Sequence, residues 1–258
     1  MMKEKSIKRI KISGHRGFKA KEIENTKKAV ERAIQNKIDY VEVDLRKTQD
    51  NRIVVFHDKR VHRLLNGKGK VKDYTLENLK SLTYADGQSI LTAEELFNLT
   101  KQQIKVILDV KSENIEEKLI SLIDNYDLNT QVIIQSKSWK FIERCFNLAP
   151  SLDYALYKSY IGKLPILGRI GRIQKKMAQF CYNVSIKPYP IDYMSLDGPF
   201  MYNEILNILK KNGIKIILGA MMTEYFLKNI QEWHVDIINA NDPVKIRNIL
   251  EHKTKKRN

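Results

Sequence analysis

The residues of this sequence that can perform acid-base and phosphate chemistry gather in its first quarter, at the ends of short apolar runs. One run begins at Ile12 and ends in His15 and Arg16, which lie between two glycines. This pattern predicts a buried strand with an imidazole and a guanidinium at its C-terminal end. A later apolar run begins at Ile53 and ends in His57, which supplies a second imidazole.

Two carboxylates come between these histidines. The segment from Tyr40 to Asp44 alternates apolar and acidic residues, so a strand there places Glu42 and Asp44 on one face, with Val41 and Val43 on the other. Adjacent carboxylates repel each other unless a positive charge lies between them, and Ca²⁺ and Mg²⁺ prefer oxygen ligands. Two histidines, an arginine and this acidic pair therefore predict a site that hydrolyses a phosphate ester.

A further expected strand adds an acid and a lysine two residues apart, Asp109 and Lys111. Asp109 would complete a carboxylate triad around the metal ion, and Lys111 would hold a phosphate oxygen. The same two residues could instead form a buried salt bridge with each other. Asn25, at the start of the first expected helix, either caps that helix or orients a group of the site.

The composition suits a globular protein with a substantial core: 258 residues, 43% hydrophobic and 29% charged. Cys145 and Cys181 have no CxxC spacing, so we expect buried free thiols and a reducing compartment. The basic segment that opens the sequence is not followed by an apolar one, and no apolar run approaches the ~20 residues that span a bilayer. These features predict a cytoplasmic protein.

The formal net charge of +16 indicates a surface that attracts anions. A lysine-rich solvated surface without a specific partner is the simplest interpretation. We find no nucleic-acid module and therefore do not expect nucleic acid as a partner. A peripheral contact with an anionic membrane is possible on charge grounds, and the sequence leaves the oligomeric state undetermined.

Short β-branched runs alternate with amphipathic helical stretches along most of the chain. The expected strands are Arg9–Ser13, Tyr40–Asp44, Lys105–Val110, Gln131–Gln135, Asp153–Leu156, Asp192–Leu196, Lys215–Leu218 and Val235–Ile238. The expected helices are Asn25–Gln35, Thr92–Leu99, Asn114–Asn125, Trp139–Asn147, Met201–Lys211, Thr223–Gln231 and Val244–His252. This alternation predicts an α/β fold, a TIM (β/α)8 barrel that forms one domain over residues 1–258, with a frayed basic tail at 252–258.

The candidate site residues fall where such a barrel has its active site, at the C-terminal face of the strands. Together with their neighbours they resemble the glycerophosphodiester phosphodiesterase family. The residues that carry the resemblance are His15-Arg16-Gly17, Glu24-Asn25-Thr26, Glu42-Val43-Asp44, His57-Asp58, Arg63 and the turn Asn66-Gly67-Lys68-Gly69. We interpret Arg63 and this turn as structural, in a small excursion after the second barrel strand.

The resemblance implies hydrolysis of a glycerophosphodiester to glycerol 3-phosphate and an alcohol. His15 and His57 would be the acid-base pair, with Arg16 as a further catalytic and substrate-binding residue. The implied metal ligands for Ca²⁺ or Mg²⁺ are Glu42, Asp44 and Asp109. The implied substrate-binding residues are Arg16, Asn25 and Lys111.

Three positions depart from the family pattern. Asp109 stands where members usually carry glutamate, and its shorter reach shifts the ion or inserts a water molecule. The run Leu218–Met222 replaces a tryptophan-containing segment that usually lines the alcohol-binding side, and Ile23 replaces a proline. These departures keep two alternatives open: a phosphodiesterase for lysophospholipids or polyglycerol-phosphate polymers, and an inactive protein that binds phosphate esters.

Overall fold

The structure is a computed structural model that describes residues 9–158, 191–197, 203–219, 230, 233 and 235–255. Its strands are β1 (Lys11–Gly14), β2 (Tyr40–Lys47), β3 (Ile53–Val55), β4 (Lys105–Val110), β5 (Val132–Ser136), β6 (Asp153–Lys158), β7 (Tyr193–Leu196), β8 (Lys215–Leu218) and β9 (Ile237–Ala240). Its helices are α1 (Lys27–Gln35), the 3-10 helix η1 (Val71–Asp73), α2 (Leu76–Lys80), α3 (Ala93–Thr100), α4 (Glu116–Asn125), α5 (Trp139–Leu148), α7 (Asn203–Lys211) and α9 (Pro243–Lys255).

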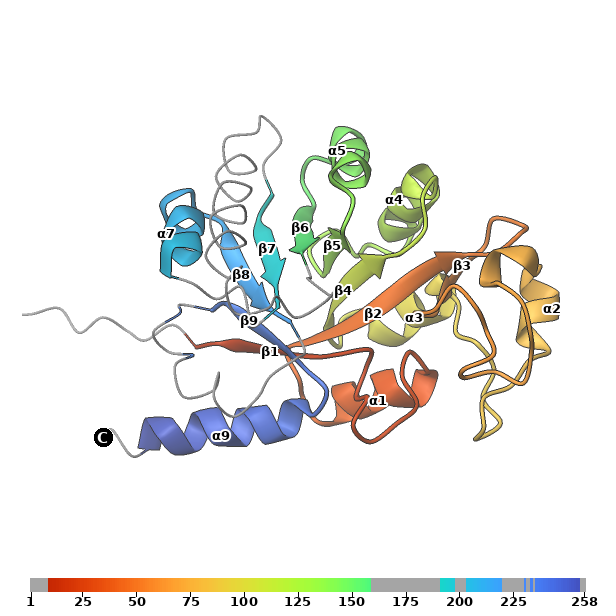
Figure 1. Cartoon of the computed structure of the whole chain (residues 1–258), viewed down its shortest axis with the longest axis horizontal. Coiled ribbons are helices and arrows are strands. Elements are labelled where there is room, and N and C mark those ends of the chain that lie inside the picture. Colours follow the sequence, from red (N-terminus) through yellow and green to blue (C-terminus); the bar gives the residue numbers. More distant parts are fainter. Residues whose placement is uncertain are drawn as a thin grey trace, which may run out of the picture.

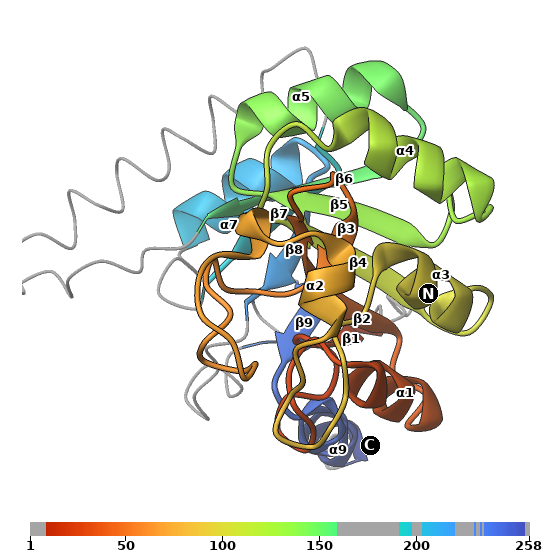
Figure 2. The ribbon, with the colours of Figure 1, turned by 90° about the vertical axis from the view of Figure 1, so that its right-hand side faces the viewer.

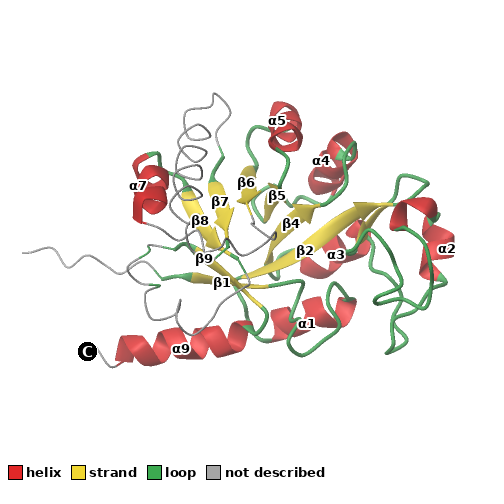
Figure 3. Ribbon diagram, in the orientation of Figure 1, coloured by secondary structure: helices red, strands yellow, loops and turns green. Residues whose placement is uncertain are grey.

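Eight parallel strands form a closed barrel within the described ranges, and the helices pack around its outside (Figures 1 and 3). The barrel closes because β1 pairs with β2 on one side and with β9 on the other. The remaining strand, β3, pairs antiparallel with the end of β2 and lies outside the barrel. The predicted TIM barrel is therefore confirmed.

Some predictions lie outside the described residues. They concern Cys181 and nearly all of the expected helix Thr223–Gln231. Cys145 is described and is a buried free cysteine, as predicted. The tail that we expected to fray from residue 252 is helical through Lys255, at the end of α9.

The alternation of β2 explains how the strand faces two environments. Val41, Val43 and Leu45 are fully buried in the main hydrophobic cluster, which includes residues of the surrounding helices. On the opposite face, Tyr40 belongs to a separate cluster of inward-facing residues contributed by successive strands. Its other members are Ile107, Ile133, Ala155, Tyr193, Ile217 and Ile237.

Six polar residues and one glycine follow this apolar layer at a constant spacing. Two residues beyond each of its members, the next inward position lies nearer the C-terminal face of the barrel. These positions are Glu42, Asp109, Gln135, Tyr157, Ser195, Gly219 and Asn239, and all of them line one cavity. The apolar layer thus closes the barrel below, and the polar layer forms the floor of the site above it.

The predicted excursion after the second barrel strand is present. From β3 to Ile90 the chain folds over one end of the barrel, where it contributes η1 and α2, and Figure 2 faces this side. The segment has its own buried apolar cluster, formed by Val54, Phe56, Val61, Leu65, Val71, Leu79, Tyr84 and Ile90. His57 lies within this segment, directly after Phe56, so the excursion and the site are directly joined. Within the described residues, no helix has the length and apolar character needed to cross a membrane.

Candidate active site

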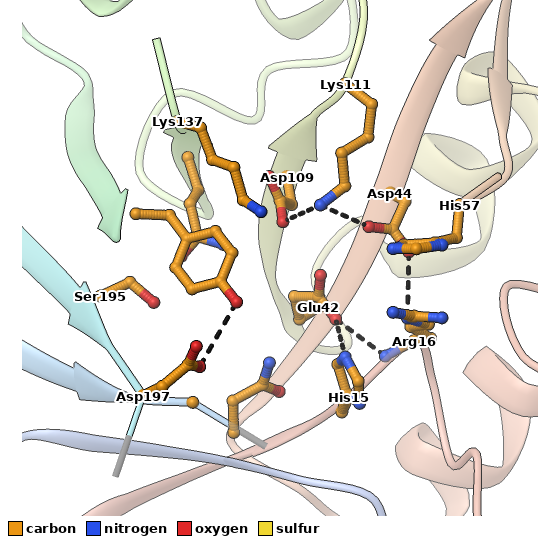
Figure 4. A pocket seen from close by; sticks show the side chains of 14 residues that line it. His15, Arg16, Glu42, Asp44, His57, Asp109, Lys111, Lys137, Ser195 and Asp197 are labelled. Atoms are coloured by element: carbon orange, nitrogen blue, oxygen red, sulfur yellow. Dashed lines mark hydrogen bonds and ion pairs between the residues drawn. The ribbon is translucent and has the colours of Figure 1, made fainter. Parts of the chain in front are cut away.

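A cavity of about 240 Å³ opens at the C-terminal ends of the barrel strands (Figure 4). It contains nearly all of the predicted site residues, although they come from four separate segments of the chain. They are His15, Arg16, Glu42, Asp44, His57, Asp109 and Lys111. Asn25 is the predicted site residue that does not line it.

The three acidic residues form a compact group. Glu42, Asp44 and Asp109 are buried, and one carboxylate oxygen of each lies within 4.8 Å of the others. Burial and the charges of the two neighbouring carboxylates raise the pKa of Glu42 to about 8. Asp109 Oδ1 is buried without a hydrogen-bond donor at bonding distance among the described residues. Three carboxylates this close together, with one oxygen that accepts no hydrogen bond from the described residues, fit a hard divalent cation.

Lys111 lies against this group. Its ammonium is 3.1 Å from Asp44 Oδ1 and also contacts Asp109 Oδ2 (Figure 4). Burial opposes ionisation of Asp44, but Lys111 and Arg16 outweigh it and lower the pKa of this carboxyl. The salt bridge between Asp109 and Lys111, which was the alternative interpretation of this pair, exists and lies inside the cavity, so the two interpretations are compatible.

The side chain of His15 is held by Asn241, the residue that follows β9. Its Nδ1 lies 2.7 Å from the side-chain oxygen of Asn241, which can only accept, so Nδ1 donates and Nε2 is left without a proton. Nε2 is 3.9 Å from Glu42 Oε2. Burial lowers the pKa of His15 to about 4 despite the hydrogen bond to Asn241. Near neutral pH this imidazole is uncharged and can accept a proton at Nε2.

His57 has a different partner. Its Nδ1 lies 2.7 Å from Asp58 Oδ1, and its backbone oxygen accepts a hydrogen bond of 2.8 Å from Arg46 Nε. The Asp58 carboxylate can accept only from an Nδ1–H, so it fixes the orientation of the imidazole. The two candidate catalytic histidines therefore differ in what their Nδ1 atoms contact, an amide oxygen for His15 and a carboxylate for His57.

Arg63 connects His57 to Arg16, which corrects the interpretation of Arg63 as part of a structural turn. Its guanidinium ion-pairs with Asp58, the partner of His57, and with Glu24. Glu24 in turn accepts a 2.8 Å hydrogen bond from Arg16 Nη1. Sequence reasoning missed this role because Glu24 lies 39 residues from Arg63 in the chain, and no sequence pattern brings it together with Asp58.

Arg16 and Asn25 both have left-handed backbone conformations, with φ of 53° and 61°. The Arg16 backbone N–H donates to Glu42 Oε2 at 2.9 Å. Gly17 follows with φ of 89°, and a Cβ there would lie 2.5 Å from Ala29 Cβ, so the motif requires glycine at this position.

Asn25 holds Asp44 at both ends of its side-chain amide. Its Nδ2 donates to Asp44 Oδ2 at 2.8 Å, and its Oδ1 accepts from the Asp44 backbone N–H at 3.1 Å. The N-cap of α1 is Thr26, so the capping alternative for Asn25 was wrong and the orienting one was right. Fully buried and bonded to Asp44, Asn25 has the geometry of a positioning residue instead of a substrate-binding one.

A second half of the cavity was not predicted. It is lined by side chains from β5 to β9: Gln135, Lys137, Tyr157, Ser195, Asp197 and Asn239. The signal was present in the sequence, because each follows an inward apolar residue of its strand at a spacing of two or four residues. These positions lacked the dense motifs that singled out the first half.

Fold and site together define a class of protein. A TIM barrel carries, at its C-terminal face, a buried carboxylate group suited to a cation, beside basic groups suited to a phosphate. Residues 15–161 match the sequence profile of the Glycerophosphoryl diester phosphodiesterase family. The glycerophosphodiester phosphodiesterase of Bacillus altitudinis is 32% identical over 254 residues, which cover 92% of this chain and 98% of that protein. The chain belongs to this family, so it is a phosphoric diester hydrolase by membership, as predicted.

Other relatives agree. The glycerophosphodiester phosphodiesterase of Caldanaerobacter subterraneus subsp. tengcongensis is 29% identical over 93% of this chain and 97% of its own. The crystal structure of a putative glycerophosphodiester phosphodiesterase from Galdieria sulphuraria superposes with a TM-score of 0.79 at 24% identity, over 95% of this chain and 99% of that one. A phosphodiesterase from Oleispira antarctica, solved with the product sn-glycerol-3-phosphate, gives a TM-score of 0.74 at 20% identity, over 93% and 96% of the two chains. These two likenesses show the same fold.

Proposed function

We propose that this protein hydrolyses glycerophosphodiesters to glycerol 3-phosphate and an alcohol. The observation that carries the proposal is the convergence, on one cavity, of two imidazoles, two basic groups and a buried carboxylate triad. Family membership and the product named for the Oleispira antarctica structure support the same substrate class.

Phosphate binding falls to Arg16 and Lys111. A phosphodiester is an anion, and charge on its oxygens must be neutralised as a nucleophile attacks. Arg16 can bond two phosphate oxygens through its planar guanidinium, while Lys111 contributes a compact positive charge. The same two residues neutralise the acidic group when no substrate is present.

The environments of the histidines suggest their division of labour. His15 is neutral with a free Nε2, so it takes a proton from the attacking water. His57, which the Asp58 carboxylate orients through Nδ1, gives a proton to the departing alkoxide oxygen. One proton is thus removed from water and one is returned to the alcohol, and the P–O bond to the alcohol breaks.

Glu42, Asp44 and Asp109 would hold the divalent cation, Ca²⁺ or Mg²⁺. When bound, the cation would neutralise charge on the phosphoryl oxygens. Asn25 keeps Asp44 in place by bonding both ends of its amide to that residue. Arg16 keeps Glu42 in place through its backbone N–H.

Release of glycerol 3-phosphate from glycerophosphodiesters, in Mg²⁺, in Ca²⁺ and in a chelator, tests the proposal. We expect turnover that the chelator abolishes, and a loss of roughly 10²-fold or more in kcat for His15→Ala and His57→Ala. His62→Ala is the matched control, since His62 is an exposed histidine of the excursion. Equal turnover by wild type and by both site variants would refute the proposal.

A further inference from the structure

The helices α1 and α9 lie next to each other on the outside of the barrel (Figures 1 and 2). They are joined where Arg247 Nη1 of α9 donates a 2.8 Å hydrogen bond to the backbone oxygen of Asn36, at the end of α1. A groove between them shares no described lining residue with the candidate active site. Its volume of about 500 Å³ lies within the ~300–1,000 Å³ typical of sites for small molecules.

The charged side chains of this groove are mostly basic. Among the described lining residues, the basic ones are Lys21, Arg32, Lys245 and His252, and the acidic one is Asp242. Asp242 Oδ1 already accepts a 3.0 Å hydrogen bond from the Lys245 backbone N–H, and Arg32 is paired with Glu22. The side chains of Lys21 and Lys245 are exposed, and neither forms an ion pair with a carboxylate of the described residues. This excess of cations attracts an anion.

The buried part of the groove is apolar. Phe18 lines it and is 3% exposed. Val244 and Ile249 of α9 also line it, and both are partly buried against the main hydrophobic cluster. Exposed ion pairs alone contribute little to binding, but a ligand that also covers these three side chains gains from the burial of hydrocarbon. The groove therefore suits a molecule with an anionic head and a short apolar body.

The groove is connected to His15 through the backbone. Lys21 lies in the loop after β1, where the Ala20 backbone N–H donates a 3.0 Å hydrogen bond to the backbone oxygen of Asn241. The side chain of Asn241 accepts from His15 Nδ1, and the next residue, Asp242, lines the groove. A ligand that contacts both this loop and the start of α9 therefore stabilises the segment that orients His15.

We propose that the groove between α1 and α9 binds an organic anion with a short alkyl chain. Its charged head lies between Lys21 and Lys245, and its chain covers Phe18 and Ile249. Because the ligand contacts both walls, it favours the state in which Ala20 is bonded to the segment after β9. This binding is independent of diester hydrolysis.

Isothermal titration of the full chain with octanoate, octylammonium and acetate tests the proposed ligand class. We expect octanoate to bind about tenfold or more tightly than either of the others, because octylammonium has the opposite charge and acetate lacks the chain. Equal affinities for octanoate and octylammonium would overturn the proposal.

A double variant, Lys21→Gln/Lys245→Gln, tests the location. We expect it to bind octanoate about tenfold more weakly than wild type. Lys210→Gln/Lys211→Gln is the matched control, since it removes two exposed charges from the end of α7 and should leave the affinity unchanged. If both double variants bind octanoate equally well, the ligand lies elsewhere, the candidate active site included, and the proposal is wrong.

Hydrogen exchange tests the connection to the loop. We expect saturating octanoate to slow exchange of the Ala20 amide in wild type but not in Lys21→Gln/Lys245→Gln, because the ligand stabilises the state in which this N–H is bonded to Asn241. The Gly87 amide, which is bonded to Tyr84 in the excursion, should exchange at the same rate with and without octanoate. Unchanged exchange at Ala20 in wild type would overturn the connection.

Discussion

Lys111 is the residue whose position bears most directly on cation binding. Its ammonium lies among the carboxylates that would hold the ion, 3.1 Å from Asp44 Oδ1. A bound cation must displace this ammonium or tolerate its repulsion. Lys111 therefore stabilises the acidic group in the metal-free protein and opposes binding of the cation that we propose for this site.

Replacing Lys111 by methionine should consequently separate metal binding from turnover. We expect Lys111→Met to bind Ca²⁺ or Mg²⁺ roughly tenfold more tightly, since one nearby unit charge is removed, and to hydrolyse diesters more slowly. Isothermal titration measures the affinity, with Lys59→Met as an exposed control in the excursion. Weaker ion binding by Lys111→Met would contradict this account.

The ion pairs of Glu24 make the stability of the folded protein depend on pH. Burial opposes ionisation, but Arg63, Arg16 and Lys19 lower the pKa of Glu24 from 4.5 to about 2. Because the folded pKa lies below the unfolded one, the folded state binds fewer protons between these values. The contribution to stability is complete above pH about 4.5 and is lost as the pH falls toward 2.

We therefore expect Glu24→Gln to lower the free energy of unfolding by about 3 kcal/mol at pH 7, because the folded protein lowers this pKa from 4.5 to about 2. At pH 3.5 the loss should be smaller by about 1.4 kcal/mol. Urea unfolding at the two pH values measures both differences. A loss that does not change with pH would show that Glu24 acts through packing instead of charge.

At the scale of elements, the excursion between β3 and Ile90 contacts the partners of two site residues, His57 and Arg16. It packs on its own apolar cluster, and Arg63 extends from it to Asp58 and Glu24. His57 and Arg16 therefore depend on one side chain that lies outside the barrel and is 44% exposed.

Arg63→Met should lower kcat by tenfold or more and change KM less, because the reacting groups lose orientation while the cavity itself remains. Arg63→Lys should recover part of the activity, since one positive charge returns without the fork that contacts both carboxylates. Arg60→Met is the control, an exposed arginine three residues away. No recovery by lysine, together with a lowered melting temperature in both variants, would mean that Arg63 only stabilises the fold.

The elements themselves were largely predictable. All eight barrel strands were placed within two residues at their first residue because each has a short run rich in apolar or aromatic residues. The end of β2 was missed, since its last residues, Leu45 to Lys47, are held by antiparallel pairing with β3. The helix α2 has only five residues, too few for a helical period to be recognised.

The site could be predicted where chemically active residue types lie close together in the sequence at a regular spacing. It was less predictable where contacts between distant parts of the chain determine the position of a side chain. The positions of Glu42 and Asp44 followed from alternation alone. The left-handed conformation of Asn25 and its bonds to Asp44 depend on how the loop before α1 returns to the strand. Asp197 and Asn239 lie in short polar stretches that carry no motif, so only an assumed barrel register would have found them.

For the whole molecule, the net charge of +16 leads to a prediction about binding to anionic surfaces and not about the fold. We expect the protein to bind vesicles that contain anionic lipid, and this binding to weaken strongly as salt rises, because exposed charges are screened within about 10 Å at 0.1 M. Cosedimentation with anionic and neutral vesicles over a salt series measures it. Equal binding to both vesicle types would remove the electrostatic explanation, and the cytoplasmic location stays a prediction in either case.

The closure of the barrel by its first and last strands has a consequence for synthesis. His15 takes its orientation from Asn241, 226 residues farther along the chain. At translation rates of about 5–20 residues per second, Asn241 is synthesised roughly 10–45 s after His15. A chain that ends before Asn241 therefore contains every motif of the first half of the site but lacks the hydrogen-bond partner of His15.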